Sequence, residues 1–380
     1  MKKYRIGEVT ENLDNLRKPL NSIQRSSISK KKLYPYYGAN NLIDYVDEYI
    51  FDEEILCVAE DGGSWGYKEK CTYIVNEKCW VNNHAHVLRA KDNLNIAYLS
   101  YYLNYNDLNS HITGTTRGKL TKSALSNIEI LLPELEKQNI IVEILDKAQE
   151  LIDRRKEQIA MLDELVKSKF IEMFGDPFND EKGFGTNKLG EVTGVNPKKA
   201  EIKDLDKELL VSFVPMDRVG EKGEFNPEVS KSIGEVYSGF TYFRENDVLF
   251  AKITPCMENG KGAVAVNLSN GIGFGSTEFH VLRPLREKSN SYWIYHLTTL
   301  IEFRRLAERK MTGSAGQKRV PTDFLNNIQV VVPPIELQNQ FADFVKKTDK
   351  LKFEMEKSLK ELEDNFNSLM QKAFKGELFN

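Results

Sequence analysis

Two short glycine loops carry side chains suited to contacting a nucleic-acid backbone. The first loop runs from Gly114 to Lys119 and the second from Gly313 to Arg319. Glycine permits close backbone approach, hydroxyls suit phosphate oxygens, and a long donor can reach a base edge. An Arg or Lys donor favours guanine, and Gln favours adenine. The candidate contact residues are Thr115, Thr116, Arg117, Lys119, Ser314, Gln317, Lys318 and Arg319.

A plain structural interpretation competes with this one. The glycines of a strand-to-helix loop often serve turn geometry alone, and its charged side chains are then simply solvated. One copy of the loop would favour that alternative. Two copies, one in each half of the chain, favour the contact interpretation.

A second pair of loops offers weaker candidates for nucleic-acid contact. Trp65 and Tyr67 lie in a glycine-rich hairpin and could stack on sugars or unpaired bases. An equally good alternative is a hairpin that packs its aromatic side chains on its own domain. The candidate residues here are Ser64, Trp65, Tyr67, Asn259 and Lys261.

No pattern in the sequence predicts catalysis, a bound cofactor or a metal. Only three residues separate Gly114 from Gly118 and Lys119, and Leu120 stands where a phosphate-binding Walker loop needs Ser or Thr. Gly271–Gly275 lacks the GxGxxG spacing of a dinucleotide fingerprint. His84 and His86 have no thiol pair nearby, so we expect strand residues there and no metal site.

The elements that position the loops also occur twice. Residues 127–139 read NIEILLPELEKQN and residues 327–339 read NIQVVVPPIELQN. Ile6–Thr10 recurs as Leu189–Thr193. A repeat of this length is too long for a solenoid and indicates a duplicated domain with a connector. The expected parts are a first head at 1–132, a helical connector at 133–185, a second head at 186–332 and a second connector at 333–380.

Each head reads as mixed α and β, with short β-branched or aromatic runs between turn residues. Each ends in a strand, 127–132 or 327–332, followed by proline and then by a helix of about forty residues. Gly175 and Gly376 end these helices. Apolar residues spaced three or four apart predict two antiparallel coiled-coil helices in a pseudo-two-fold chain. The expected seam comprises Leu145, Ile152, Ile159, Leu162, Val166, Leu351, Met355, Leu362, Phe366 and Leu369.

Such helices would act as a ruler. Forty residues at about 1.5 Å each give roughly 60 Å, whereas equivalent half-sites on one face of DNA lie about 34 Å apart per turn. Two heads held by paired helices are therefore expected to reach separate stretches of one duplex.

Composition sets the remaining bounds. The 380 residues are 41% hydrophobic and 29% charged, as expected for ordinary globular domains. The opening residues lack the apolar stretch of a secretory signal, so a cytoplasmic location is expected. The four cysteines form no CxxC pair, which argues against a zinc or disulfide framework. The net charge of −3 is unusual for a nucleic-acid binder, although residues 1–33 hold nine Lys or Arg against three acids.

The sequence resembles the specificity subunits of Type I restriction-modification systems over essentially its whole length. The resemblance rests on Tyr34–Asn40, Ile43–Tyr45 and Ala59–Gly62 in the first head, and on Phe213–Asp217 in the second. The two glycine loops and the Leu-Pro and Val-Pro helix starts belong to the same pattern. Each motif is weak by itself, but their order and duplication are specific.

The resemblance implies two target-recognition domains, each reading one half of a bipartite DNA target. It also implies a subunit without catalytic activity that docks two copies of an adenine-N6 methyltransferase subunit. S-adenosylmethionine would bind that partner and not this chain, and a restriction and motor subunit would complete the complex. Whether the glycine loops face DNA or the methyltransferase stays open.

The alternative is a coiled-coil scaffold without catalytic activity that presents two protein-binding domains. The acidic net charge supports this alternative, because a scaffold needs no basic surface. Salt-dependent DNA binding would distinguish the two interpretations.

Overall fold

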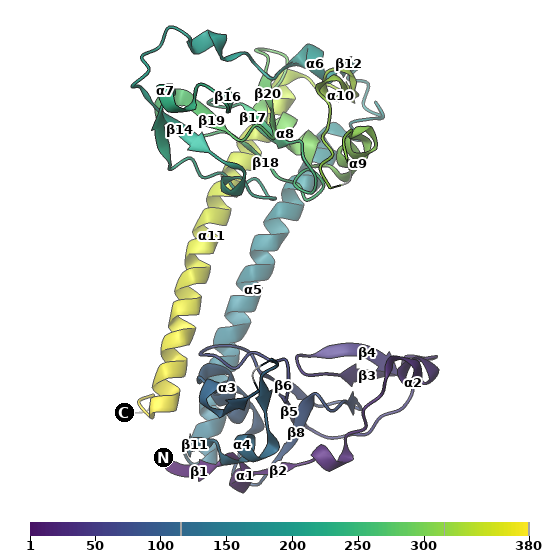
Figure 1. Cartoon of the computed structure of the whole chain (residues 1–380), viewed down its shortest axis with the longest axis vertical. Coiled ribbons are helices and arrows are strands. Elements are labelled where there is room, and N and C mark those ends of the chain that lie inside the picture. The colour runs from purple at the N-terminus through teal and green to yellow at the C-terminus, as the bar shows by residue number, and fades with distance from the viewer. Residues whose placement is uncertain (115, 315, 379–380) are drawn as a thin grey trace. The chain divides into compact units, whose positions relative to one another are not determined.

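The structure is a computed structural model that describes residues 1–114, 116–314 and 316–378. The chain packs into two compact units. One unit comprises Met1–Lys156 and Lys357–Asn380, and the other comprises Glu157–Glu356. Each unit therefore contains one head and one half of each long helix (Figure 1). Among the described residues, no helix has an apolar stretch long enough to cross a bilayer.

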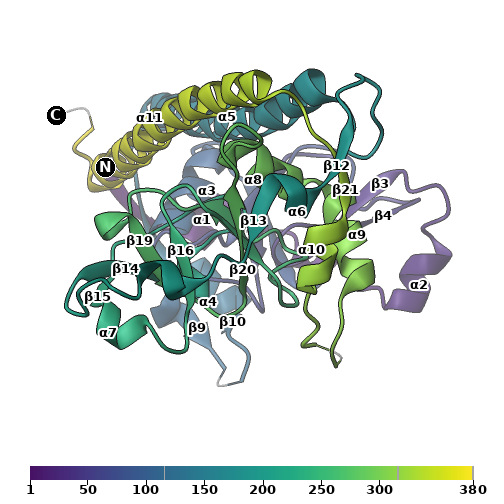
Figure 2. The same cartoon turned by 90° about the horizontal axis from the view of Figure 1, so that it is seen from above.

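The first head is built on an antiparallel sheet of strand order β2-β8-β5-β6 and a smaller sheet of order β4-β3-β7. Strands β9 and β10 form a hairpin that projects from the head (Figure 2). The strands are β1 Lys2–Arg5, β2 Thr10–Asn12, β3 Tyr34–Tyr37, β4 Leu42–Val46, β5 Ile55–Ala59, β6 Thr72–Val75, β7 Trp80–Val81, β8 Ala85–Ala90, β9 Ile112–Thr113, β10 Lys119–Leu120 and β11 Glu129–Leu132. The helices are α1 Ile6–Val9, α2 Ser22–Ser27, α3 Ile96–Tyr105 and α4 Lys122–Asn127, with 3-10 turns η1 Asp14–Leu16 and η2 Asn109–His111.

The second head repeats the main sheet as β13-β20-β17-β18, but its other sheet has four strands in the order β15-β14-β19-β16. The strands are β12 Thr186–Lys188, β13 Thr193–Val195, β14 Leu210–Val214, β15 Ser230–Ser232, β16 Thr241–Arg244, β17 Val248–Ala251, β18 Gly262–Val264, β19 Ile272–Gly275, β20 Phe279–Pro284 and β21 Gln329–Val331. The helices are α6 Leu189–Val192, α7 Ile233–Val236, α8 Ser291–Thr299, α9 Ile301–Lys310 and α10 Thr322–Asn327, with 3-10 turns η3 Lys199–Ile202, η4 Met216–Arg218 and η5 Ser269–Gly271.

The first and last strands of each head pair with each other. Strand β1 pairs antiparallel with β11, and β12 pairs antiparallel with β21. The shared GEVT segment follows in both heads, and the residue before it donates a backbone hydrogen bond to Ile128 in one head and Ile328 in the other. The expected fold class, two mixed α and β heads with a pair of long helices, is confirmed.

The long helices are α5 Leu135–Phe174 and α11 Ile335–Lys375. Gly175 and Gly376 follow them with φ of 75°, a left-handed conformation that glycine adopts without a steric penalty. In the first unit, Leu145 near the start of α5 packs in one core with Phe374 near the end of α11. In the second unit, the ring centroids of Phe170 and Phe341 lie 5.5 Å apart. Both contacts require the helices to run in opposite directions.

Fewer of the predicted seam residues are buried between the helices than the sequence suggests. Leu145, Ile152 and Val166 are buried, and Ile159, Leu162, Met355, Leu362, Phe366 and Leu369 are partly buried. Leu351 is 47% exposed, so it lies off the seam and corrects that expectation. The neighbouring residue Lys352 turns inward instead, and its Nζ lies 2.6 Å from Oδ1 of Asp163. Thr348 in the seam is buried and donates its hydroxyl hydrogen to the carbonyl of Phe344.

A buried glutamine explains the strongest part of the repeat. Gln138 in the first turns of α5 donates to the carbonyls of Pro133 and Asn93 and accepts from the backbone N–H of Asn95. Gln338 makes the same three kinds of bond to Pro333, Lys288 and Asn290. Both side chains are fully buried. Each amide therefore joins the start of a long helix to the start of the helix, α3 or α8, that covers the main sheet.

Two short helices precede the last strands of the heads and were not expected from the sequence. The expected strands at 127–132 and 327–332 begin two residues later, because Asn127 and Asn327 end the short helices α4 and α10. These helices pack against the GEVT segment, and a Cβ on Gly7 would lie 3.1 Å from the Cβ of Ser126. Helices of fewer than two turns are too short to show a helical period in the sequence.

We predict that Gln338→Leu destabilises the protein, because the substitution leaves one backbone N–H and two backbone carbonyls, each buried or partly buried, without their partner. The expected loss is about 2–4 kcal/mol in the free energy of unfolding. Urea unfolding followed by fluorescence measures it. Gln149→Leu on α5 is the control, since Gln149 makes an exposed bond to Asp153. Equal stability of the two variants would contradict the role assigned to Gln338.

Candidate nucleic-acid interface

The two glycine loops have the same backbone design. Gly114 has φ of 96° and Gly313 has φ of 122°, conformations that disfavour other residues. A Cβ on Gly114 would lie 2.4 Å from the carbonyl oxygen of Arg117, and a Cβ on Gly313 would lie 2.8 Å from that of Gln317. These two glycines therefore serve turn geometry, whatever the loops contact. Thr115 lies outside the described residues.

The returning arm of each loop is fastened to the segment that follows a buried strand. Leu120 donates its backbone N–H to the carbonyl of Glu60 after β5, at 2.8 Å. Val320 donates to the carbonyl of Lys252 after β17, at 2.9 Å. Glu60 and Lys252 thus occupy equivalent positions. Lys119 and Arg319 are also equivalent, because they form isolated backbone β-bridges to Asp61 and Ile253, respectively.

A buried histidine forms a hydrogen bond to the returning arm of each loop. Nε2 of His86 donates to the carbonyl of Leu120 at 2.8 Å, and Nε2 of His280 donates to that of Val320 at 2.7 Å. The other nitrogen of His280 accepts from the amide of Asn196 at 3.0 Å. Burial, with Lys252 nearby, lowers the pKa of His280. A neutral ring fits this site.

In the first head, a charged carboxylate takes the place of the neutral amide beside the histidine. Asp14 stands where the second head has Asn196, since each accepts a backbone N–H from β8 or β20. Its Oδ2 lies 2.6 Å from Nδ1 of His86. Burial opposes ionisation of Asp14, but hydrogen bonds from His86 and from the N–H of Val87 outweigh it and lower the pKa.

Glu60 completes this charged cluster. Its carboxylate lies 2.7 Å from Nη1 of Arg17 and 2.9 Å from Nζ of Lys119. Burial raises its pKa, but these two bonds outweigh burial and leave the pKa below its ordinary value. Asp14, Glu60 and His86 lie close enough to share a cation. Arg17 and Lys119 already compensate the carboxylates, so the cluster serves to anchor the loop.

The long donors of the loops differ in their partners. Nη2 of Arg117 lies 2.7 Å from Oδ1 of Asp61, and Arg319 makes two bonds to the carboxylate of Glu278. The side chains of Gln317 and Lys318 are exposed and have no polar partner in the part of the chain that the structure describes. Thr116 and Ser314 are exposed as well. The second loop therefore presents more unpaired donors than the first.

The sequence pattern does not identify the acids that hold these loops, although Glu60 and Asp61 lie within the Ala59–Gly62 motif. One signal was available in the first head, where Glu60 and Asp61 directly follow an apolar strand and precede two glycines. Glu278 carried no comparable signal, because its pairing with Arg319 joins residues far apart in the chain.

The second pair of loops is held mainly within its own head. Trp65 is 6% exposed and donates its indole N–H to the carbonyl of Ala59, which corrects the expectation that it could stack on a base. Tyr67 is 56% exposed and bonds the hydroxyl of Tyr105. Ser64 and Asn259 are exposed, and Lys261 donates to the carbonyl of Met216. Tyr67, Ser64 and Asn259 remain accessible candidates.

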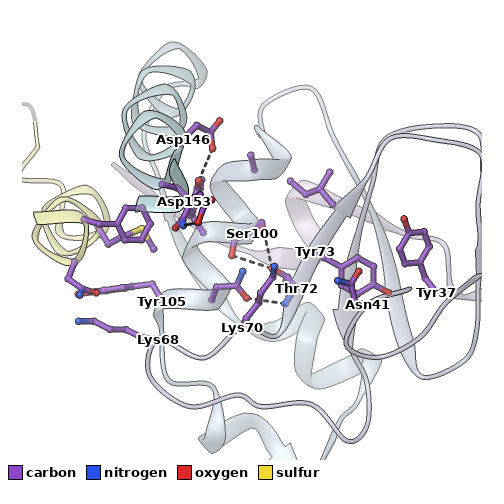
Figure 3. Close-up of a pocket in the computed structure, with 18 residues that line it drawn as sticks. Tyr37, Asn41, Lys68, Lys70, Thr72, Tyr73, Ser100, Tyr105, Asp146 and Asp153 are labelled. Carbon is purple, nitrogen blue, oxygen red and sulfur yellow. Dashed lines mark hydrogen bonds between the residues drawn. The ribbon is translucent and has the colours of Figure 1, made fainter. Parts of the chain in front are cut away.

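A pocket of about 740 Å³ with a mixed polar and apolar lining lies in the first unit, beside β6 and α3 and against the long helices (Figure 3). Several of its polar groups bond one another. The hydroxyls of Thr72 and Ser100 lie 2.8 Å apart, and Tyr101 donates to Asp146 at 2.6 Å. Lys68 and Lys70 line the pocket together with Asp146 and Asp153. This mixture of charges does not define a site for one class of ligand.

Asp14→Asn places in the first head the residue type of Asn196 in the second head. We predict that this substitution makes the stability of the first head depend less on pH below pH 6. The lowered pKa of Asp14 gives stability above its unfolded value of 3.8, and this stability is lost as the pH falls through the folded value. Asp14→Asn should therefore cost about 1–2 kcal/mol at pH 6 and less at pH 3. Urea unfolding in a Trp293→Phe background, where Trp65 and Trp80 report, measures this difference.

The control for this experiment is Glu129→Gln, which removes an exposed ion pair with Lys3 in the same head. It should leave the pH dependence unchanged. An equal loss of stability between pH 6 and pH 3 in Asp14→Asn and in the unaltered chain would contradict the charged anchor.

Comparison with known proteins gives a consistent result. Residues 1–162 and 181–364 match the family model described as Type I restriction modification DNA specificity domain. The chain is 39% identical to the specificity subunit of the Type I restriction enzyme EcoEI of Escherichia coli over 160 residues, which is 42% of this chain and 26% of that protein. It spans about a quarter of the length of the E. coli EcoEI and EcoAI relatives. A putative Type I specificity subunit of Haemophilus influenzae is 27% identical over 359 residues, covering 91% of this chain and 87% of that protein.

Solved structures share the fold at lower identity. The Type I S subunit of M. genitalium aligns with a TM-score of 0.55 and 14% identity, covering 98% of this chain and 96% of that one. A chain from work on complex assembly and conformational transition of the type I R-M system aligns with a TM-score of 0.56 and 16% identity, covering 99% and 98%. Because the family model covers both halves, the chain belongs to the family of specificity subunits of Type I restriction-modification systems, as the resemblance indicated.

Proposed function

We propose that this chain reads a bipartite, asymmetric DNA target for a Type I restriction-modification complex. The observation that carries the proposal is the pair of equivalent heads with unlike loops. The anchors of the loops match, yet Arg117 and Lys119 in one head correspond to Gln317, Lys318 and Arg319 in the other. The smaller sheets differ too, with three strands in one head and four in the other. Two heads that differ in this way should prefer different half-sites.

The partners in this proposal are double-stranded DNA, two copies of an adenine-N6 methyltransferase subunit and, in the full complex, a restriction and motor subunit. The chain itself takes no catalytic part. S-adenosylmethionine binds the methyltransferase. The modest net charge of −3 fits this division of labour, because methyltransferase subunits that enclose the duplex supply further phosphate contacts. A cytoplasmic location follows from action on chromosomal DNA.

The coiled-coil scaffold remains the alternative class, since the acidic net charge favours it. The two proposals differ in how binding responds to salt. Neutralising phosphates gives a negative slope of log affinity against log salt, whereas a protein-binding scaffold gives a flat response to duplex DNA. A flat response, with and without the methyltransferase, would favour the scaffold.

We predict that exchanging residues 186–332 for the second head of another specificity subunit changes only one half of the methylated sequence. The reason is that each head contains its own loop and its own anchoring histidine. Mapping of N6-methyladenine after co-expression with the methyltransferase measures the outcome. A change in both halves of the motif, or in neither, would contradict the assignment of one half-site to each head.

We also predict that Lys318→Gln weakens binding of the chain and its methyltransferase to duplex DNA and makes the salt slope shallower by about 0.9, the value of one phosphate contact. Arg286→Gln is the matched control. Arg286 is 96% exposed but follows β20 at the end opposite to His280 and the loop. An unchanged slope in Lys318→Gln, or the same change in Arg286→Gln, would remove the second loop from the interface.

A further inference from the structure

The arginines of both glycine loops are held by carboxylates of their own head. Arg117 pairs with Asp61 at 2.7 Å, and Arg319 forms two bonds of 2.9 and 2.7 Å to Glu278. In each pair the arginine is more exposed than its partner. The side chains of Arg117 and Asp61 are 61% and 19% exposed, and those of Arg319 and Glu278 are 43% and 24% exposed. Each acid thus lies behind a donor that points outward.

The two acids do not occupy equivalent positions. Asp61 corresponds to Ile253, since these residues form the bridges to Lys119 and Arg319. Glu278 corresponds to His84, since their carbonyls accept from the backbone N–H groups of Lys252 and Glu60. The carboxylate follows β5 in one head and precedes β20 in the other. The duplication of the head therefore does not explain why the arginine of each loop has a carboxylate partner.

The acids are firmly placed. The carboxylate of Asp61 also bonds Nδ1 of His84, at 2.8 and 3.0 Å. Glu278 binds Arg319 in the two-pronged geometry that fixes a guanidinium in one plane, and its pKa is lowered mainly by that bond. The arginines are thus oriented before any ligand arrives. An exposed ion pair of this kind is weak enough for a ligand to share or replace.

A carboxylate beside an arginine affects two DNA acceptors differently. A phosphate carries a negative charge, so the carboxylate repels it and offsets the attraction of the arginine. The edge of guanine is uncharged and offers two acceptors in the spacing that an arginine fork fits. The acid should therefore weaken contacts with the backbone more than contacts with a base.

We propose that Asp61 and Glu278 are specificity-determining residues that reduce binding to DNA of any sequence and direct Arg117 and Arg319 to base edges. This inference rests on the proposed function of the chain. It also accounts for loops whose positive charge is largely neutralised in a protein of net charge −3. Neither acid touches DNA in this role; each acts by positioning an arginine and by repelling phosphate.

The test uses the full chain in complex with its methyltransferase. Two duplexes serve as probes: one carries the motif found by methylation mapping, and the other is a scrambled sequence of equal length. Asp61→Asn should tighten binding to the scrambled duplex about fivefold and steepen its salt slope by up to about 0.9. Affinity for the motif should change less, so the ratio of the two affinities falls. Glu278→Gln tests the second head in the same way.

The matched control is Glu53→Gln. Glu53 pairs with Arg89 in the first head at 2.5 Å but precedes β5, at the end opposite to Asp61. Glu53→Gln changes the net charge by the same amount as Asp61→Asn and should leave the ratio of the two DNA affinities unchanged. Asp61→Glu keeps the charge and should restore the discrimination that Asp61→Asn loses, which distinguishes a positioning role from damage to the fold.

An unchanged affinity ratio in both Asp61→Asn and Glu278→Gln, or an equal fall in Glu53→Gln, would overturn the inference while leaving the proposed function intact. A complex of the unaltered chain that binds both duplexes equally would instead overturn the proposed function itself.

Discussion

The buried amides of Gln138 and Gln338 are the contacts on which the architecture of each unit depends. Each amide belongs to a fully buried glutamine and links the start of a long helix to the start of the helix that covers the main sheet, through three hydrogen bonds that are buried or partly buried. A buried amide that loses its partners costs far more than an exposed one, so this joint permits little variation. The direction in which each helix leaves its head is fixed there. The glycine loops can then differ between heads while this joint stays the same.

Much of this architecture could be predicted from the sequence because the chain states it twice. The prolines at 133 and 333 and the glycines at 175 and 376 mark helix ends by local chemistry alone. The long helices α5 and α11 lie between these marks. The short helices α4 and α10 could not be found in this way. Their contacts with the GEVT segment are long-range, and so few residues carry too little periodicity.

The candidate interface shows the same division between local and long-range information. The glycines of the loops were visible because their backbone conformation restricts the residue type locally. The histidines that hold the loops, and the acids that pair with their arginines, depend on strands brought together by folding. Trp65 illustrates the limit, since a tryptophan in a glycine hairpin fits stacking on a base and packing in a core equally well, and only its burial decides.

The anchors of the two loops make the heads equivalent in backbone and unlike in charge. Asp14 and Glu60 in one head correspond to Asn196 and Lys252 in the other. These residues surround a histidine, which donates a hydrogen bond to the equivalent loop carbonyl in each head. The central claim is that such paired but dissimilar heads read two different sequences. Mapping N6-methyladenine in a host that co-expresses the unaltered chain and its methyltransferase tests this most directly. The account predicts a motif of two different specified halves around an unspecified spacer, and one contiguous or palindromic motif would contradict it.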